Sequence, residues 1–319
     1  MKKLFYFLLI ASVFMPYACD RTPKSTKWRD TTTTGVVPIA CDQCFEPVIQ
    51  AQIAVFETQY LAAGIVPIYT DEVEAIQLLM KDSVRLAVTS RGLTDEERTV
   101  FANKNMVVKE LKIAIDAIAL IVNKENEESI MGMPSLKQIL TGAITEWKQL
   151  NPKSKLGKID VIFDNPNSST VRYAIDSICG GKGLSEQLYA QKNNLEVLEI
   201  VSKVPGALGI IGVNWISNEN DSTGLSFSDK IKVLAVGRYA NPDQFNSFEP
   251  FQYQIISGHY PMVRNVYILL SDPKSGLSTG FASFATSDRG QRIILKSGLI
   301  PATGYIKIRE VNVYDKDPY

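Results

Sequence analysis

VRLAVTSRGLTDEE, residues 84–97, contains the clearest strand-to-helix transition in this sequence. The apolar run Val84–Thr89 predicts a short buried strand. Thr94 is followed three residues later by Glu97, which is capping-box spacing and predicts a helix start. The loop between them, Thr89-Ser90-Arg91-Gly92, carries hydroxyls and a guanidinium. The stretch therefore predicts a strand–loop–helix unit whose loop can face an anion.

The same alternation extends to both sides of this unit. Upstream, short apolar strands at 36–40 and 66–69 are each followed by a helix, over 46–61 and 72–81. Downstream, strands are expected at 106–111, 117–122, 159–163, 207–213 and 262–270, with helices at 135–140, 168–179 and 275–296, the last broken near Ser287. Serial strand–helix–strand units predict a mostly parallel, helix-covered sheet. The alternation is too long for one sheet, so two α/β lobes are expected.

Composition excludes several function classes. The chain has 319 residues, with 45% hydrophobic and 21% charged, as in a globular protein. Lys plus Arg equal Asp plus Glu at 34 each, so no basic footprint for nucleic acid is present. His259 is the only histidine, which excludes a metal site built on several imidazoles. No Gly-x-Ser-x-Gly elbow surrounds any serine, and we expect neither an enzyme nor a cofactor.

The N-terminus has the pattern of a targeting segment. A basic start, Met1–Lys3, precedes the apolar run Leu4–Met15, which is short for a membrane span and predicts a signal peptide over 1–18. Cys19 then stands where a bacterial lipoprotein carries its lipid. Residues 19–34 are rich in Thr, Lys and Asp and predict a flexible tether. We therefore expect an exported, lipid-anchored protein of the bacterial cell envelope that faces the periplasm.

The three other cysteines leave alternatives open. Cys41 and Cys44 form a C-x-x-C pair, which in an oxidising compartment could be a disulfide or a redox motif. They could equally be small buried residues at a strand–helix junction. Together with Cys179 they make a poor zinc site.

Ligands of α/β sheets bind beyond the carboxyl ends of strands, where helices begin. Four loops have this character: 42–45, 69–72, 89–92 and 165–170. Taken singly, their Ser and Thr residues are ordinary helix caps. Arg91 taken singly would pair with a surface carboxylate. No single loop decides the function.

Seven ordered segments resemble the periplasmic phosphate-binding proteins of ABC importers (the PstS-like family). Residues 84–97 are similar to that family's "SR-x-L-x-x-E" segment, and 113–124 (IAIDAIALIVNK) to "A-x-D-x-I-A-x-I-V-N". The others are LKQILTGAITEW (136–147), SST (168–170), PGALG (205–209), YPMVR (260–264) and the pair GQ (290–291) with GLIP (298–301). Together they are distributed along residues 84–301.

The resemblance implies a type II periplasmic-binding-protein fold. Each of two lobes would be a mixed sheet flanked by helices, and two crossover strands would join them. Lobe one would comprise residues 35–112 plus 265–319, and lobe two residues 113–264. By this resemblance the chain would be a monomer that captures inorganic phosphate or a similar oxyanion and delivers it to an ABC permease.

The resemblance also implies the site. The expected ligand-binding residues are Gln43, Cys44, Ser90, Arg91, Ser168, Ser169, Thr170 and Arg172, with Gln43 and Cys44 contributing backbone N–H groups. Three acids stand near the pocket where the family pattern has none: Asp42, Glu72 and Asp164. A carboxylate close to a phosphate is repulsive, but it can also accept the proton of a protonated phosphate. The alternative is an envelope sensory or interaction lipoprotein that binds another ligand or none.

Overall fold

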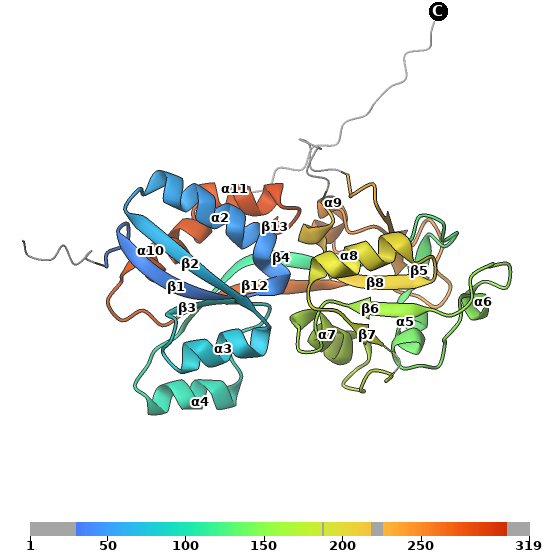
Figure 1. Cartoon of the computed structure of the whole chain (residues 1–319), viewed down its shortest axis with the longest axis horizontal. Coiled ribbons are helices and arrows are strands. Elements are labelled where there is room, and N and C mark those ends of the chain that lie inside the picture. Colours follow the sequence, from blue (N-terminus) through green and yellow to red (C-terminus); the bar gives the residue numbers. More distant parts are fainter. Residues whose placement is uncertain (1–29, 187, 218–225, 305–319) are drawn as a thin grey trace, which may run out of the picture.

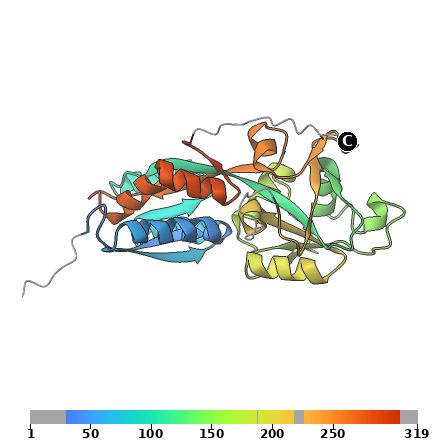
Figure 2. The same ribbon diagram turned by 90° about the horizontal axis from the view of Figure 1, so that it is seen from above.

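The computed structural model describes residues 30–186, 188–217 and 226–304. The predicted signal peptide, Cys19 and most of the predicted tether lie outside these residues. Within the described ranges, no helix combines the length and apolarity that a membrane span requires. Figures 1 and 2 show two bodies joined by strands that pass between them.

The first lobe is a three-layer α/β sandwich. It contains β1 (Gly35–Asp42), β2 (Ala63–Thr70), β3 (Leu86–Thr89), α2 (Glu46–Gln59), α3 (Glu72–Met80) and α4 (Asp95–Asn103). Strands β2, β1 and β3 are parallel neighbours in that order. Successive residues of β3 face opposite cores: Leu86 and Val88 pack with α2, while Ala87 packs with α3 and α4. This period of two explains why helices cover both faces (Figure 1).

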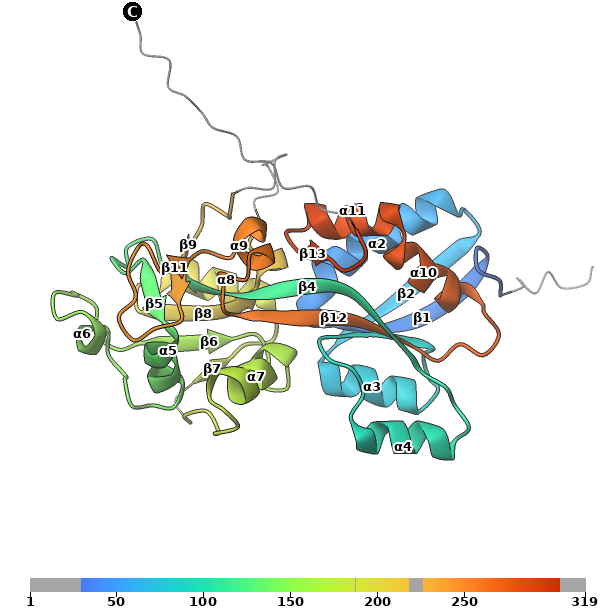
Figure 3. The same cartoon turned by 180° about the vertical axis from the view of Figure 1, so that it is seen from behind.

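Two long strands connect the lobes. β4 (Lys109–Val122) and β12 (Val263–Leu270) are antiparallel and pair from Lys109 opposite Leu270 to Ala117 opposite Val263. They run side by side from one body to the other (Figure 3). The two crossover strands of the expected fold are therefore present. The sequence predicted two strands at 106–111 and 117–122, where the structure has one strand of 14 residues.

The second lobe continues the sheet beyond β4. Its strands are β5 (Ile130–Gly132), β6 (Asp160–Phe163), β7 (Tyr189–Ala190), β8 (Ala207–Gly212), β9 (Lys232–Val233), β10 (Ala235–Gly237) and β11 (Ser247–Phe248). Its helices are α5 (Met133–Leu140), α6 (Trp147–Leu150), α7 (Ser169–Tyr173), α8 (Asn194–Lys203) and α9 (Gln252–Ile256). β8 pairs antiparallel with β4 and parallel with β6, so this sheet is mixed, whereas β11, β10 and β5 form a separate three-stranded sheet.

The chain then returns to the first lobe. Helices α10 (Leu277–Thr286) and α11 (Asp288–Lys296) pack beside α2, and β13 (Ile300–Pro301) pairs with β4. Ser287 ends α10 and caps α11, as the predicted break near this residue required. The fold class is the one expected. The exact lobe boundaries stay a prediction, because β4 and β12 cross from one core to the other without a break.

Candidate functional site

The carboxyl ends of β1, β2, β3 and β6 bring the four candidate loops to the junction of the lobes. β1 ends at Asp42, and a 3-10 turn, Gln43–Phe45, leads into α2. β2 leads through Asp71 into α3, and β3 leads into Ser90 and Arg91. On the other side, the loop after β6 leads through Ser168 into α7. The loops of the first lobe thus face those of the second.

A buried ion pair lies between the crossover strands. Arg264 on β12 stands directly opposite Asp116 on β4, and its Nε donates to Asp116 Oδ2 at 2.9 Å. Both side chains are almost fully buried, at 4% and 0% exposure. Burial acts to lower the pKa of Arg264, but Asp116 outweighs it and the pKa lies above its ordinary value. Arg264 is therefore a permanent cation inside the protein.

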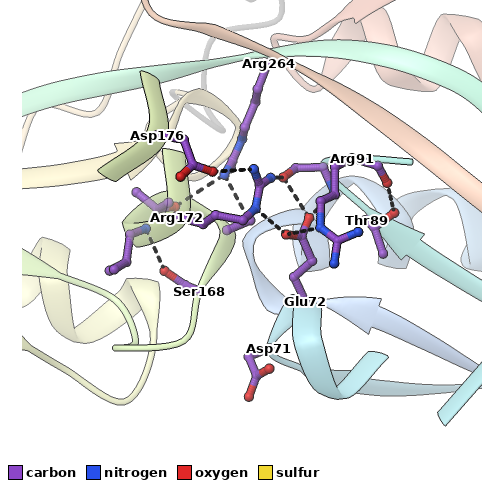
Figure 4. Close-up of polar contacts among 12 residues, drawn as sticks. Asp71, Glu72, Thr89, Arg91, Ser168, Arg172, Asp176 and Arg264 are labelled. Atoms are coloured by element: carbon purple, nitrogen blue, oxygen red, sulfur yellow. Dashed lines mark hydrogen bonds and ion pairs between the residues drawn. The ribbon is translucent and has the colours of Figure 1, made fainter. Parts of the chain in front are cut away.

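The guanidinium of Arg264 points toward the first turn of α7 (Figure 4). Its Nη1 donates to Ser169 Oγ at 2.8 Å and to Thr170 Oγ1 at 3.5 Å. It lies over the ring of Phe45, 4.9 Å from the centroid, in a cation–π contact. Its Nη2 is buried and has no hydrogen-bond partner among the described residues. In the part of the chain that the structure describes, the guanidinium thus binds two hydroxyls through Nη1 and has one unpaired donor at Nη2.

Cys44 connects the lobes on the other side of those hydroxyls. Its thiol donates to Asp164 Oδ2 at 3.2 Å and lies 3.3 Å from Thr170 Oγ1. Its carbonyl oxygen accepts bonds from Asn214 Nδ2 and Trp215 Nε1 of the second lobe. Burial, followed by the nearby Asp164, raises the pKa of the Cys44 thiol well above its usual range. The thiol is therefore neutral and acts as a hydrogen-bond donor.

Asp164 is held by three donors from three segments. Ser168 Oγ donates to Oδ1 at 2.7 Å, and Cys44 Sγ and Asn194 Nδ2 donate to Oδ2 at 3.2 and 3.3 Å. The carboxylate is 1% exposed. Both carboxylate oxygens of Asp164 are therefore satisfied by hydrogen bonds inside the protein.

Asp42 has fewer hydrogen-bond partners than Asp164. Its Oδ1 accepts the backbone N–H of Cys44 at 3.0 Å, while Oδ2 is buried without a partner among the described residues. Burial, and then the nearby Glu72, raise the pKa of Asp42 to about 7, although Arg264 acts in the opposite direction. Asp42 therefore changes its charge near neutral pH. The Cys44 N–H, expected to face a ligand, is already bonded to Asp42.

Glu72 forms the third cluster of the site (Figure 4). Its Oε1 accepts from Ser90 N at 2.7 Å and Ser90 Oγ at 2.8 Å. Its Oε2 accepts from Arg172 Nε at 2.7 Å and lies 3.6 Å from Arg91 Nε. Arg172 also donates from Nη2 to Ser90 Oγ at 2.7 Å. A carboxylate of the first lobe is thus bound directly by an arginine of the second.

Arg91 has a second, stronger partner. It binds Glu97 in a two-pronged arrangement, Nη1 to Oε2 at 2.7 Å and Nη2 to Oε1 at 2.8 Å. Glu97 also completes the predicted capping box with Thr94. The hydrogen bonds that Arg91 donates to Glu97 raise the pKa of Arg91, and burial offsets only part of this effect. Most of the bonding capacity of Arg91 is therefore used within its own lobe.

Carboxylates outnumber guanidinium groups around the junction. The acids are Asp42, Glu72, Glu97, Asp116, Asp164 and Asp176, and the cations are Arg91, Arg172 and Arg264. At neutral pH, an anion entering the junction therefore needs either a protonated carboxyl or the displacement of an internal one.

The structure brings the expected site residues into two groups. Cys44, Ser168, Ser169 and Thr170 lie together near Arg264, whereas Ser90, Arg91 and Arg172 surround Glu72. Gln43 begins the 3-10 turn and is half-buried. The three expected pocket acids are all 1% exposed and lie in or beside these groups. Whether these residues bind a ligand stays a prediction.

Sequence reasoning missed Arg264, Asp116, Asn194 and Asn214 as site residues. A signal for the first two was present. Each is the only charge in a largely apolar stretch, VRNVYILL (263–270) and IAIDAIALIV (113–122). Charged residues are almost never fully buried unless they are paired, so two such strands predict a buried pair. The two asparagines carried no comparable signal.

Cys41 and Cys44 are both free and buried, which matches the interpretation of small buried residues at a strand–helix junction. Among the described residues, no group of three or more His, Cys, Asp or Glu side chains is arranged to hold a metal ion. The site is therefore a cluster of hydroxyls, one thiol, carboxylates and guanidinium groups.

Comparison with known proteins gives one consistent result. A family model described as a PBP superfamily domain matches residues 29–289. The phosphate-binding protein PstS of Staphylococcus aureus (strain bovine RF122 / ET3-1) is 24% identical over 220 residues. That match spans 67% of this chain and 63% of the relative's length, so about a third of the relative is not matched.

Two solved structures show the same fold. A protein with bound phosphate from Clostridium perfringens is 24% identical, with a TM-score of 0.67 over 84% of this chain and 100% of the other. An ABC-type phosphate transport receptor from Vibrio cholerae is 20% identical, with a TM-score of 0.62 over the same shares. At these identities the likeness concerns the fold alone.

Proposed function

This chain belongs to the PBP superfamily, and we propose that it captures inorganic phosphate, or a close oxyanion, between its lobes for an ABC importer. In this proposal the expected ligand residues supply hydroxyl and guanidinium donors, and the crossover strands are the hinge. A ligand that contacts both lobes favours the closed arrangement.

One observation carries the proposal: within the described ranges, the buried Arg264 binds two hydroxyls through Nη1 and has an unpartnered donor at Nη2. Arg264 directs Nη1 to Ser169 and Thr170, and Nη2 has no partner among the described residues. A buried donor without a partner costs about 1–3 kcal/mol, and more when it is charged. An oxyanion at this point would satisfy that donor with a charge-assisted bond.

The carboxyl groups near this point favour an oxyanion that carries an ionisable proton. Asp42, with a pKa of about 7, is partly protonated at neutral pH. A neutral Asp42 can donate to an oxyanion, and a charged Asp42 can accept the proton of hydrogen phosphate. Sulfate is fully deprotonated at this pH and offers no proton. The proposal therefore favours phosphate over sulfate.

The setting of the protein is proposed on the same basis. Curated relatives are named phosphate-binding proteins, and one structural relative is an ABC-type phosphate transport receptor. We propose an exported monomer that is lipid-anchored at Cys19, faces the periplasm and meets an ABC permease. No catalytic residue is assigned.

Calorimetric titration of phosphate into the purified full-length chain tests the proposal. We expect saturable one-site binding of phosphate and none of sulfate. A chain with Ser169→Ala and Thr170→Val should bind phosphate at least tenfold more weakly, because it loses two hydroxyls beside Arg264. Thr99→Val, an exposed threonine on α4, is the matched control and should bind like the wild type. No heat and no rise in melting temperature with phosphate would overturn the proposal.

A further inference from the structure

Glu72 occupies the donors that a bound oxyanion would use at the Ser90–Arg172 group. Its two oxygens receive three hydrogen bonds of 2.7–2.8 Å, from Ser90 N, Ser90 Oγ and Arg172 Nε. Arg91 Nε approaches the same carboxylate at 3.6 Å. The side chain is 1% exposed. A small anion with two oxygens in this position would make the same contacts.

We propose that Glu72 is an internal anion that holds the two lobes together without a ligand and competes with the oxyanion for Ser90 and Arg172. The competition rests on the proposed function. The holding role does not, because the contact from Arg172 on α7 to Glu72 on α3 joins the lobes directly.

The geometry favours this role over that of an ordinary surface ion pair. Glu72 follows Asp71, the N-cap residue of α3, so its carboxylate is fixed at the start of a helix. Ser90 Oγ links the two charges, since it donates to Glu72 and accepts from Arg172. By contrast, Arg172 Nη1 lies 3.4 Å from Oδ2 of Asp176, four residues further along the chain, and the Asp176 side chain is about half exposed. The inter-lobe bond is the shorter and more buried one.

Electrostatics couples this contact to lobe closure. A buried carboxylate that loses its cation partner is strongly destabilised, so Glu72 and Arg172 favour remaining together while the lobes are closed. When the lobes open, water solvates both groups. A carboxylate tethered within reach of its donors also acts at an effective concentration of at least the millimolar range. A free oxyanion must therefore displace an internal competitor.

The substitution Glu72→Gln removes the negative charge and keeps the size of the side chain. We expect faster amide hydrogen exchange at 168–172 and 89–91 in the unliganded chain, because the cross-lobe ion pair is lost. We also expect phosphate affinity to rise at least tenfold, because Arg172 and Ser90 become available. Glu74→Gln is the matched control: it changes an exposed glutamate on the same helix and should alter neither property.

A second variant tests the same contact from the other lobe. Arg172→Gln should also accelerate exchange at 89–91 without phosphate, but it should not raise phosphate affinity, because it removes a cation from the site. This variant changes a side chain that is 33% exposed, which makes loss of folding a lesser concern.

The outcomes separate the two proposals. If exchange and phosphate affinity of Glu72→Gln both equal those of the wild type, the inference is wrong. If exchange accelerates but phosphate affinity does not rise while the wild type binds phosphate, the competition is wrong. If neither the wild type nor Glu72→Gln binds phosphate, the proposed function fails. If amide exchange is still faster in Glu72→Gln and Arg172→Gln, the holding role of Glu72 stands.

Discussion

Replacing Asp42 with asparagine should make the folded chain less sensitive to alkaline pH. Asp42 is buried beside Glu72, and its pKa is raised from 3.8 to about 7. The folded state therefore binds more protons than the unfolded state between these pH values. The contribution of this group to stability is fully present below about pH 4 and is lost as pH rises through 7.

The size of the effect follows from the two pKa values. A shift of this size corresponds to about 4 kcal/mol at most, at 1.36 kcal/mol for each pKa unit. Between pH 4.5 and 8 the stability lost through Asp42 is about 3 kcal/mol. Asparagine keeps the oxygen that accepts the Cys44 N–H, and it cannot ionise. Relative to the wild type, the free energy of unfolding of Asp42→Asn should therefore rise by about 3 kcal/mol between pH 4.5 and pH 8.

Urea unfolding of both chains at pH 4.5, 6 and 8 measures this gain. Comparing pH values cancels any pH-independent cost of the substitution. Asp288→Asn, which removes a well-exposed carboxylate on α11, gives the baseline for losing one charge. The free energy of unfolding of Asp42→Asn is compared with that of the wild type at each pH. If the difference between them is the same at pH 4.5 and pH 8, the assignment of Asp42 as a buried, partly neutral acid is wrong.

Two further predictions concern the buried polar centre. Asp116→Asn leaves Arg264 buried without its counterion and should lower the free energy of unfolding by about 3–5 kcal/mol, measured by urea denaturation; a loss below about 1 kcal/mol would show that the pair contributes little. Cys41 and Cys44 are buried thiols whose pKa values are raised by burial, so peptide mass mapping should find both unlabelled by a thiol reagent in the native chain and labelled in urea. Rapid native labelling of either cysteine would contradict the burial.

Most of the architecture is predictable because its signals are local. The capping box at Thr94 and Glu97, the break at Ser287 and the apolar strands each depend on a few neighbouring residues. Helix α8 was not predicted, although Asn193 caps it by accepting a hydrogen bond from Glu196 N. Strand β4 was predicted as two strands, 106–111 and 117–122, because Lys112 and Asp116 interrupt its apolar pattern between them.

The sequence predicted where the candidate residues would gather but not how they would pair, and their role in binding stays a prediction. The order of motifs indicated Ser90, Arg91 and the hydroxyl row, and the structure brings these residues to the junction of the lobes. Which acid pairs with which base depends on how the two lobes face one another. Glu72 and Arg172 are 100 positions apart, so no local sequence pattern predicts that they pair. Sequence alone could therefore flag three acids near the pocket without showing that one of them binds the arginine.

The most direct test of the oxyanion site is a crystal structure of the full-length chain grown with arsenate, which replaces phosphate and scatters anomalously. The proposed function predicts an arsenic peak between the lobes, within hydrogen-bonding distance of the hydroxyls of Ser169 and Thr170 and the guanidinium of Arg264. An anomalous map without a peak at this junction, or with arsenic only on the outer surface, would contradict it.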